Sequence, residues 1–89
     1  MNSDTSWVLQ IDPQVFKTVK RFPPKDRKRI LVVLANVGKD PFIGDIQKIK
    51  GEENVWRRRV GSYRVFFEIY QVEKAVHIFH VERRTSTTY

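Results

Sequence analysis

The sequence predicts an α+β fold in which two N-terminal helices pack on a four-stranded, mainly antiparallel sheet. Apolar residues recur at helical spacing between residues 13 and 37, whereas apolar and polar residues alternate between residues 55 and 81. A Gly-Ser pair at 61–62 divides the alternating region as a tight hairpin requires. We expect residues 1–89 to form a single domain, because this length leaves no room for a second core.

The chain is predicted to begin with a short strand and a short helix. Residues 7–11 are rich in strand formers. Asp12 followed by Pro13 is typical of a helix start, because the carboxylate caps free N–H groups and proline suits the first helical position. We therefore expect a helix over residues 13–20.

A second helix is predicted after the prolines that interrupt the first one. It begins at Pro24 or Lys25 and continues to about residue 36 or 37. Gly38, with a proline three residues later, is expected to end it. Residues 42–54 show only weak periodicity and are predicted to form a loop.

Three further strands are predicted in the second half of the chain, over residues 55–60, 63–72 and 75–81. A two-residue connection with glycine first suits a type II′ turn at Gly61-Ser62, which pairs Val60 with Tyr63 and fixes the register behind them. Residues 85–89 are small and polar enough to form a mobile tail.

The predicted register gathers arginines on one face of the hairpin. Arg59 lies opposite Arg64 and Arg57 opposite Phe66, all on the side away from the apolar face. Like charges that face each other across a strand pair repel, so stability alone does not favour this arrangement. Phosphate would relieve the repulsion and match the planar guanidinium groups, while Phe66 offers a surface for a stacked base. We expect a nucleic-acid-binding face; the alternative is a solvated face whose arginines pair with Glu68 or acidic loop residues.

The overall charge indicates a polyanionic partner. Seventeen Lys and Arg against ten Asp and Glu give a net charge of +7 and a pI near 10.1. The absence of cysteine excludes disulfides and Cys-ligated metals, and no apolar run approaches the roughly 20 residues that span a bilayer. The N-terminus lacks the features of a signal peptide. We expect a cytoplasmic protein without metal or other cofactor.

Five further basic or histidine residues lie near this face in the sequence. Arg58 falls on the apolar side by alternation, so either its stem reaches the rim or the strand carries a bulge. Lys48 and Lys50 would extend the basic surface, with free solvated lysines as the alternative. His77 and His80 point to opposite faces of a regular strand, which excludes a metal pair. His80 is a candidate proton donor or acceptor, with a hydrogen-bonded structural histidine as the alternative.

The hairpin reads Trp56-Arg57-Arg58-Arg59-Val60-Gly61-Ser62-Tyr63-Arg64-Val65, and Ile46-Gln47-Lys48-Ile49-Lys50-Gly51 precedes it. The predicted order of elements is a strand, two helices and a three-stranded meander. With these two segments in that order, the chain resembles the RelE/ParE toxin superfamily. In RelE-type members, matching arginines contact and cleave mRNA in the ribosomal A site, and an arginine and a tyrosine near the C-terminus complete that site. The resemblance implies a catalytic set of Arg57, Arg59, Arg64, Arg83 and Tyr89, with Arg84 as the other match for the C-terminal arginine. The expected RNA-binding set is Lys48, Lys50, Phe66, His80 and Arg84.

The function implied by the resemblance is that of a type II toxin that acts as a ribosome-dependent mRNA endonuclease. The ribose 2′-hydroxyl attacks the adjacent phosphate, so the protein orients the RNA and stabilises charge without a metal. Expected partners are a cognate antitoxin, acidic at the contact, and the ribosome with its mRNA. Two alternatives stay open: a ParE-like inhibitor of DNA gyrase without nuclease activity, and an inactive RNA-binding relative.

Overall fold

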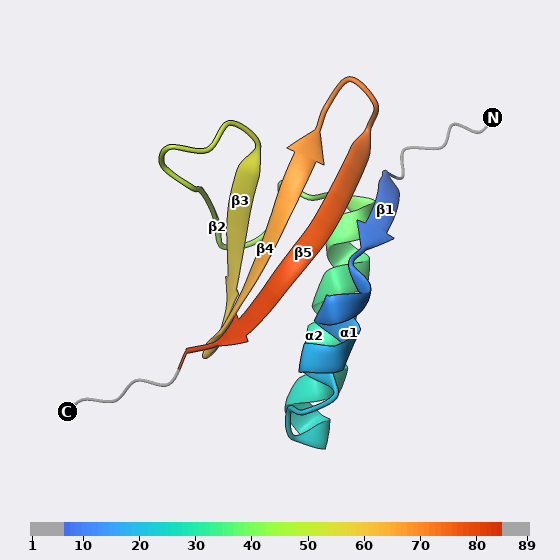
Figure 1. Cartoon of the computed structure of the whole chain (residues 1–89), viewed down its shortest axis with the longest axis vertical. Coiled ribbons are helices and arrows are strands. Elements are labelled where there is room, and N and C mark those ends of the chain that lie inside the picture. The colour runs from blue at the N-terminus through green and yellow to red at the C-terminus, as the bar shows by residue number, and fades with distance from the viewer. Residues whose placement is uncertain (1–6, 85–89) are drawn as a thin grey trace.

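The computed structural model describes residues 7–84 and confirms an α+β fold. Two helices pack on one face of a sheet and leave the other face open (Figure 1). The elements are β1 (Val8–Ile11), α1 (Pro13–Val19), α2 (Pro24–Lys39), β2 (Ile46–Lys48), β3 (Val55–Val60), β4 (Tyr63–Tyr70) and β5 (Ala75–Arg83). The predicted tail, including Tyr89, lies outside the described residues. Across residues 7–84, no helix has both the length and the apolar character needed to cross a membrane.

The sheet has five strands in the order β1-β5-β4-β3-β2, so the prediction of four strands is wrong by one. The additional strand, β2, lies in the segment predicted as a loop and pairs antiparallel with β3, with Ile46 opposite Arg58. At the other edge β1 runs parallel to β5, with Val8 opposite Ala75. Three residues are too few to show an alternating pattern, and therefore only the pairing with β3 identifies β2.

The helices begin as predicted, but α2 ends later. Asp12 caps α1, and its carboxylate accepts a hydrogen bond from the backbone N–H of Gln14 at 2.9 Å. α2 continues through Gly38 to Lys39, so the prediction that Gly38 ends the helix is wrong. A Cβ at Gly38 would lie 2.8 Å from Leu9 Cδ2. The glycine therefore allows α2 and β1 to approach closely.

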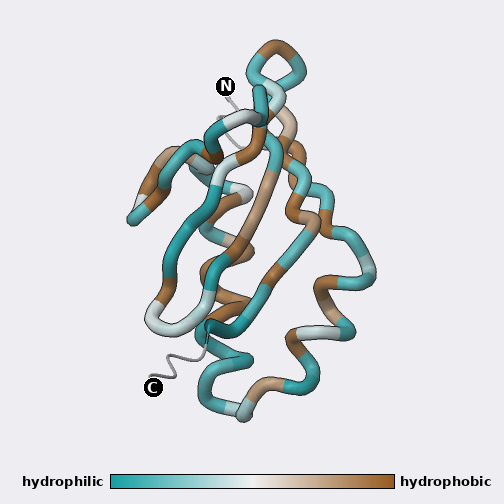
Figure 2. The backbone as a smooth tube through the Cα atoms, turned by 60° about the vertical axis from the view of Figure 1, so that its left-hand side comes forward, coloured by the Kyte–Doolittle hydropathy of each residue, from teal (hydrophilic) through white to brown (hydrophobic). Residues whose placement is uncertain are grey.

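The core lies between the helices and the sheet, and alternate residues of the strands point into it. Along β4, buried and partly exposed residues alternate from Tyr63 to Ile69. Figure 2 shows hydrophobic and hydrophilic residues interspersed along the tube, as expected for elements with one buried side. The buried apolar side chains are Val15, Val19, Ile30, Val33, Leu34, Val37, Val60, Tyr63, Val65, Phe67, Ile69, Val76, Ile78 and Val81.

A buried tyrosine anchors the start of β4 to α2. The Tyr63 hydroxyl donates a hydrogen bond to Asp26 Oδ2 at 2.7 Å, and the Tyr63 ring lies 4.6 Å from the ring of Phe22. Burial and the hydrogen bond to Asp26 raise the pKa of Tyr63 above its ordinary value of 10.0, although Arg83 and Arg29 act in the opposite direction. The folded chain therefore holds this proton more tightly than the unfolded chain does.

This anchor predicts a specific loss of stability at alkaline pH. A raised pKa in the folded state stabilises the fold below the unfolded pKa of about 10, and the contribution is lost as the pH rises through the folded pKa. In urea unfolding, the free energy of unfolding should therefore decline more steeply above about pH 10 for the wild type than for Tyr63→Phe. At neutral pH the variant should be less stable by about 1 kcal/mol, because one hydrogen bond is lost. Parallel pH profiles for the two proteins would contradict this account.

Candidate nucleic-acid interface

The open face of the sheet carries the arginines that the hairpin register selects. As predicted, Arg59 pairs with Arg64 and Arg57 with Phe66. The intervening Val65 is fully buried on the helix side, which confirms the assignment of the two faces. Neighbouring strands extend these pairs into two rows across the open face, Arg59-Arg64-Glu82 and Gln47-Arg57-Phe66-His80.

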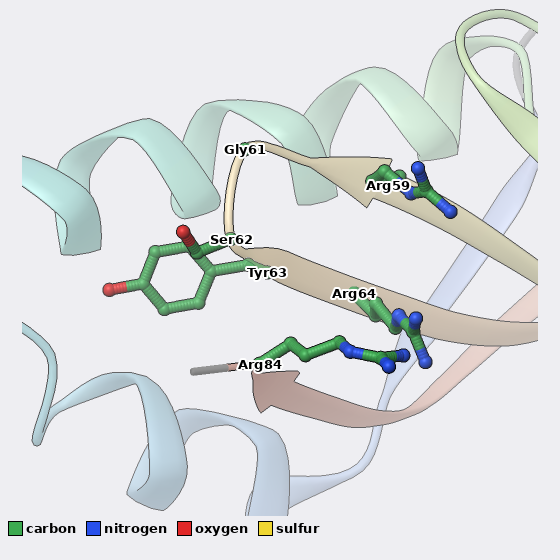
Figure 3. Close-up of a pocket in the computed structure, with 6 residues that line it drawn as sticks. All are labelled: Arg59, Gly61, Ser62, Tyr63, Arg64 and Arg84. Atoms are coloured by element: carbon green, nitrogen blue, oxygen red, sulfur yellow. The ribbon is translucent and has the colours of Figure 1, made fainter. Parts of the chain in front are cut away.

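A shallow hollow of about 380 Å³ lies on this face at the end near the β3–β4 turn. Its charged lining consists of Arg59, Arg64 and Arg84, which come from β3, from β4 and from the residue after β5. Figure 3 shows these side chains extending along the sheet in the same general direction. The Arg64 side chain is only 19% exposed, whereas Arg59 and Arg84 are exposed. This arginine hollow has the charge and the donors to receive a phosphate group.

The tight turn between β3 and β4 shapes one end of the arginine hollow. The predicted type II′ turn requires a positive φ at its first central residue and a negative φ at its second. Gly61 has a φ of +58°, and the φ of Ser62 is not positive, so both residues meet this requirement. The Ser62 carbonyl oxygen accepts a hydrogen bond from the backbone N–H of Arg84 at 2.6 Å. This bond holds the chain after β5 beside the turn and so brings Arg84 to the hollow.

Glu82 is a member of this site that was not predicted. Its Oε2 lies 3.8 Å from Arg64 Nη1, and its Oε1 lies 3.2 Å from His80 Nε2. The carboxylate therefore offsets part of the charge of Arg64 and orients the imidazole of His80. The sequence could have predicted this position of Glu82, because Glu82 and Arg84 are two residues apart and alternation along β5 places them on the same face.

Arg57 lies on the same face but one row away from the arginine hollow. Its Nη2 donates a hydrogen bond to Gln47 Oε1 on β2. Its Nε is buried and has no hydrogen-bond partner among the described residues. The neighbouring strand thus holds part of the guanidinium group, next to Phe66.

Of the two C-terminal arginines, Arg84 lines the hollow and Arg83 points to the other face. Arg83 pairs with Tyr63, and its guanidinium carbon lies 5.7 Å from the centre of the Tyr63 ring on the helix side. Because adjacent residues of a strand face opposite sides, Arg83 does not join Arg64. The expected grouping of Arg83 with the hairpin arginines is therefore corrected in favour of Arg84.

Arg58, Lys48 and Lys50 also lie away from the arginine hollow. The β3–β4 register contains no bulge, and Arg58 packs against the loop before β2. Gly44 has a φ of +103°, a conformation that favours glycine, and the Arg58 guanidinium group lies 2.7 Å from where a Cβ of this residue would stand. Lys48 pairs with Trp56 on the helix side, and Lys50 lies in the exposed turn at the far end of β3. The expected extension of the basic surface is therefore not found at Lys48, whereas that for Lys50 stays a prediction.

His77 and His80 lie on the same face, contrary to the prediction. The β4–β5 register shifts by one residue, which makes Phe79 an extra residue in β5 and changes the alternation after it. His77 Nδ1 lies 3.0 Å from Glu68 Oε1, so this carboxylate pairs with a histidine and not with the hairpin arginines. Among residues 7–84, His, Cys, Asp and Glu side chains do not form a group of three that could hold a metal ion.

Comparison with known proteins confirms the resemblance to this superfamily. Residues 11–86 match the family model described as the ParE toxin of type II toxin-antitoxin system, parDE. A Methanocaldococcus jannaschii protein named RelE1 is 27% identical over 79 residues, which cover 85% of this chain and 88% of that protein. Toxin RelE3 of the same organism is 37% identical over 57 residues, which cover 60% and 65% of the two chains.

Solved structures show the same fold. The RelE of an archaeal RelE–RelB complex from Pyrococcus horikoshii OT3 aligns with a TM-score of 0.78 at 23% identity, covering 92% of this chain and 99% of that one. The isolated E. coli RelE toxin aligns with a TM-score of 0.74 at 17% identity, covering 92% and 88%. Since the family model matches most of its length, the chain belongs to the ParE toxin family of type II toxin-antitoxin systems.

Proposed function

We propose that this protein is the toxin of a RelBE-type pair and that it cleaves mRNA on the ribosome. The observation that carries the proposal is the arginine hollow, where guanidinium groups from neighbouring strands surround a space open to solvent. Arg59 and Arg64 face each other across β3 and β4, and a phosphate between them would relieve their repulsion. The net charge of +7 adds long-range attraction for RNA.

The chemistry requires little covalent participation from the protein. The ribose 2′-oxygen attacks the adjacent phosphorus, and the bond from phosphorus to the 5′-oxygen breaks. One product carries a 2′,3′-cyclic phosphate and the other a 5′-hydroxyl. The protein orients the RNA and stabilises the negative charge that develops on the phosphoryl oxygens. Arg59 and Arg64 suit the second task, but arginine stays protonated and is therefore a poor base.

His80 supplies proton transfer in this proposal. Its Nε2 lies 3.2 Å from Glu82 Oε1, and a proton shared there leaves Nδ1 free to accept the proton of the 2′-hydroxyl. The imidazolium that forms then gives a proton to the departing 5′-oxygen, which leaves as the 5′-hydroxyl. Glu82 also lies 3.8 Å from Arg64, so a single carboxylate connects the imidazole with the arginine hollow. The carboxylate of Glu68, which lies on the same face and could also accept a proton, is engaged with His77.

An antitoxin is the proposed protein partner. The Pyrococcus horikoshii and Methanococcus jannaschii RelE structures were solved as complexes with RelB, and this chain aligns with both. A partner that covers a strongly basic surface should be acidic at the contact, because complementary charge favours association. Action on the ribosome would take place in the cytoplasm.

Inhibition of DNA gyrase without RNA cleavage is the second candidate function, and the ParE description of the matching family model favours it. Primer extension on mRNA after induction separates the two, because only a nuclease creates new 5′ ends within translated codons. A supercoiling assay with purified gyrase gives the complementary measurement.

The triple variant R57A/R59A/R64A tests the assignment of activity to this face. Growth arrest and the new 5′ ends should both disappear, because the hollow loses two of its three arginines and the adjoining row loses Arg57. Circular dichroism should show an intact fold, since all three side chains point away from the core.

The matched control, R21A/K25A/K28A, removes the same charge from exposed positions in the helical layer. It should remain toxic. Continued cleavage by the first triple variant would refute the assignment.

A further inference from the structure

Four rings that the core does not bury form a row along β4 and β5 on the open face. The ring centroids of His77 and Phe79 are 6.2 Å apart, those of Phe79 and Phe66 are 6.5 Å apart, and those of Phe66 and His80 are 5.5 Å apart. Each ring keeps some exposure to solvent. We refer to His77, Phe79, Phe66 and His80 as the aromatic track.

The β-bulge at Phe79 completes this row. In a regular strand, His80 would point to the helices and Val81 to solvent. The extra residue returns Val81 to the core, where it is 2% exposed, and leaves both Phe79 and His80 on the open face. Bulges often redirect a side chain next to functional sites. Here the bulge adds the ring of His80 to a face on which regular alternation already places Phe66, His77 and Phe79.

The charges beside the aromatic track favour a nucleic acid over an apolar protein segment. Arg57 lies directly opposite Phe66, and Glu82 and Arg64 occupy the next row. An aliphatic helix on this face would remove water from these ionised groups without compensation. A nucleic acid offers phosphates to the arginines and flat bases to the rings, the combination that single-stranded nucleic-acid sites use.

We propose that the aromatic track stacks successive bases of a single-stranded RNA whose reacting phosphate lies in the arginine hollow. The strand would run from the hollow, past Phe66 and Phe79, toward His77, away from the Gly61 turn. Glu68 contacts His77 Nδ1 at 3.0 Å and so fixes the orientation of the last ring. The choice of RNA rests on the proposed nuclease function, while the stacking itself rests on the geometry of the four rings.

Binding of a labelled RNA tests the aromatic track without the ribosome. Fluorescence anisotropy would measure the binding of a single-stranded oligonucleotide of about eight nucleotides, which is longer than the aromatic track. Its 2′-O-methyl groups replace the attacking hydroxyls, so the protein cannot cleave it. The F66L/F79L variant keeps apolar contacts but removes the stacking surfaces, and each ring should account for about 10-fold in affinity. Phe16→Leu, on the exposed side of α1, is the control and should bind like the wild type.

Salt dependence separates stacking from phosphate contact. The slope of log Kd against log salt should be unchanged in F66L/F79L, whereas Arg64→Ala should reduce it by about 0.7, the value for one phosphate contact on a single strand. F79Y keeps a ring and should retain wild-type affinity, which guards against a general effect of mutation at the bulge. A duplex of the same sequence should bind less tightly, because its paired bases cannot stack on the protein.

The outcomes distinguish this inference from the nuclease proposal. Wild-type affinity in F66L/F79L, or equal binding of single strand and duplex, would overturn the track even if the protein cleaves mRNA. Lost affinity with an unchanged salt slope supports the track even if no cleavage on ribosomes is detected, and in that case only the nuclease assignment fails.

Discussion

An Arg64→Ala variant is expected to cleave ribosome-bound mRNA about 100- to 1,000-fold more slowly than the wild type, the usual effect of removing one preorganised donor at a developing charge. Arg64 lies opposite Arg59, lines the arginine hollow and is 19% exposed. Glu82 contacts it at 3.8 Å, so its guanidinium group is oriented before RNA arrives. Single-turnover cleavage of 5′-labelled mRNA on programmed ribosomes measures the rate.

The same substitution should not lower thermal stability. It removes the repulsion from Arg59 and an ion pair with Glu82, and a pair of this kind contributes only about 0–1 kcal/mol. Arg64→Lys keeps the charge but loses the planar fork, so its rate should be intermediate. Arg21→Ala, at an exposed position in the helical layer, is the control and should cleave normally. A folded Arg64→Ala protein with the wild-type rate would show that the chemistry occurs elsewhere.

A Phe67→Ala variant is expected to lose about 3–5 kcal/mol of its free energy of unfolding. Phe67 is fully buried on β4, with Trp56 opposite it on β3 and Ile78 opposite it on β5. Removal of its ring would leave a cavity between the sheet and the helices that the surrounding strands cannot close. Urea unfolding at neutral pH, monitored by circular dichroism, measures the change.

A loss of this size in the free energy of unfolding is large for so short a chain. Proteins are typically stable by about 0.05–0.15 kcal/mol per residue, so the variant should lose a substantial part of its total stability. Phe16→Ala removes the same ring from a position that is 46% exposed and should change the free energy of unfolding by about 0.5 kcal/mol or less. Similar losses in both variants would mean that Phe67 does not hold the core together.

Local sequence was sufficient for the helix starts, the hairpin and the arginine face. Asp12 and Pro13 act within one helical turn, and Gly61 meets the φ requirement of the turn directly. Once that turn is fixed, the two-residue period of a strand places Arg59 and Arg64 opposite each other without any contribution from the helices. These features could therefore be predicted from residues close together in the chain.

Contacts between distant segments decided the remaining features of the fold and of the site. β2 exists because β3 lies beside it, and α2 continues through Gly38 because Leu9 packs against that glycine. The pairing of β5 with β4 decided that Arg84, and not Arg83, faces the arginine hollow. The same pairing inserted the bulge that brings His80 to the open face, because Val81 is then buried in the core. Alternation along one strand determines only which residues share a face, whereas the partner strand and the packed core determine where that alternation is interrupted.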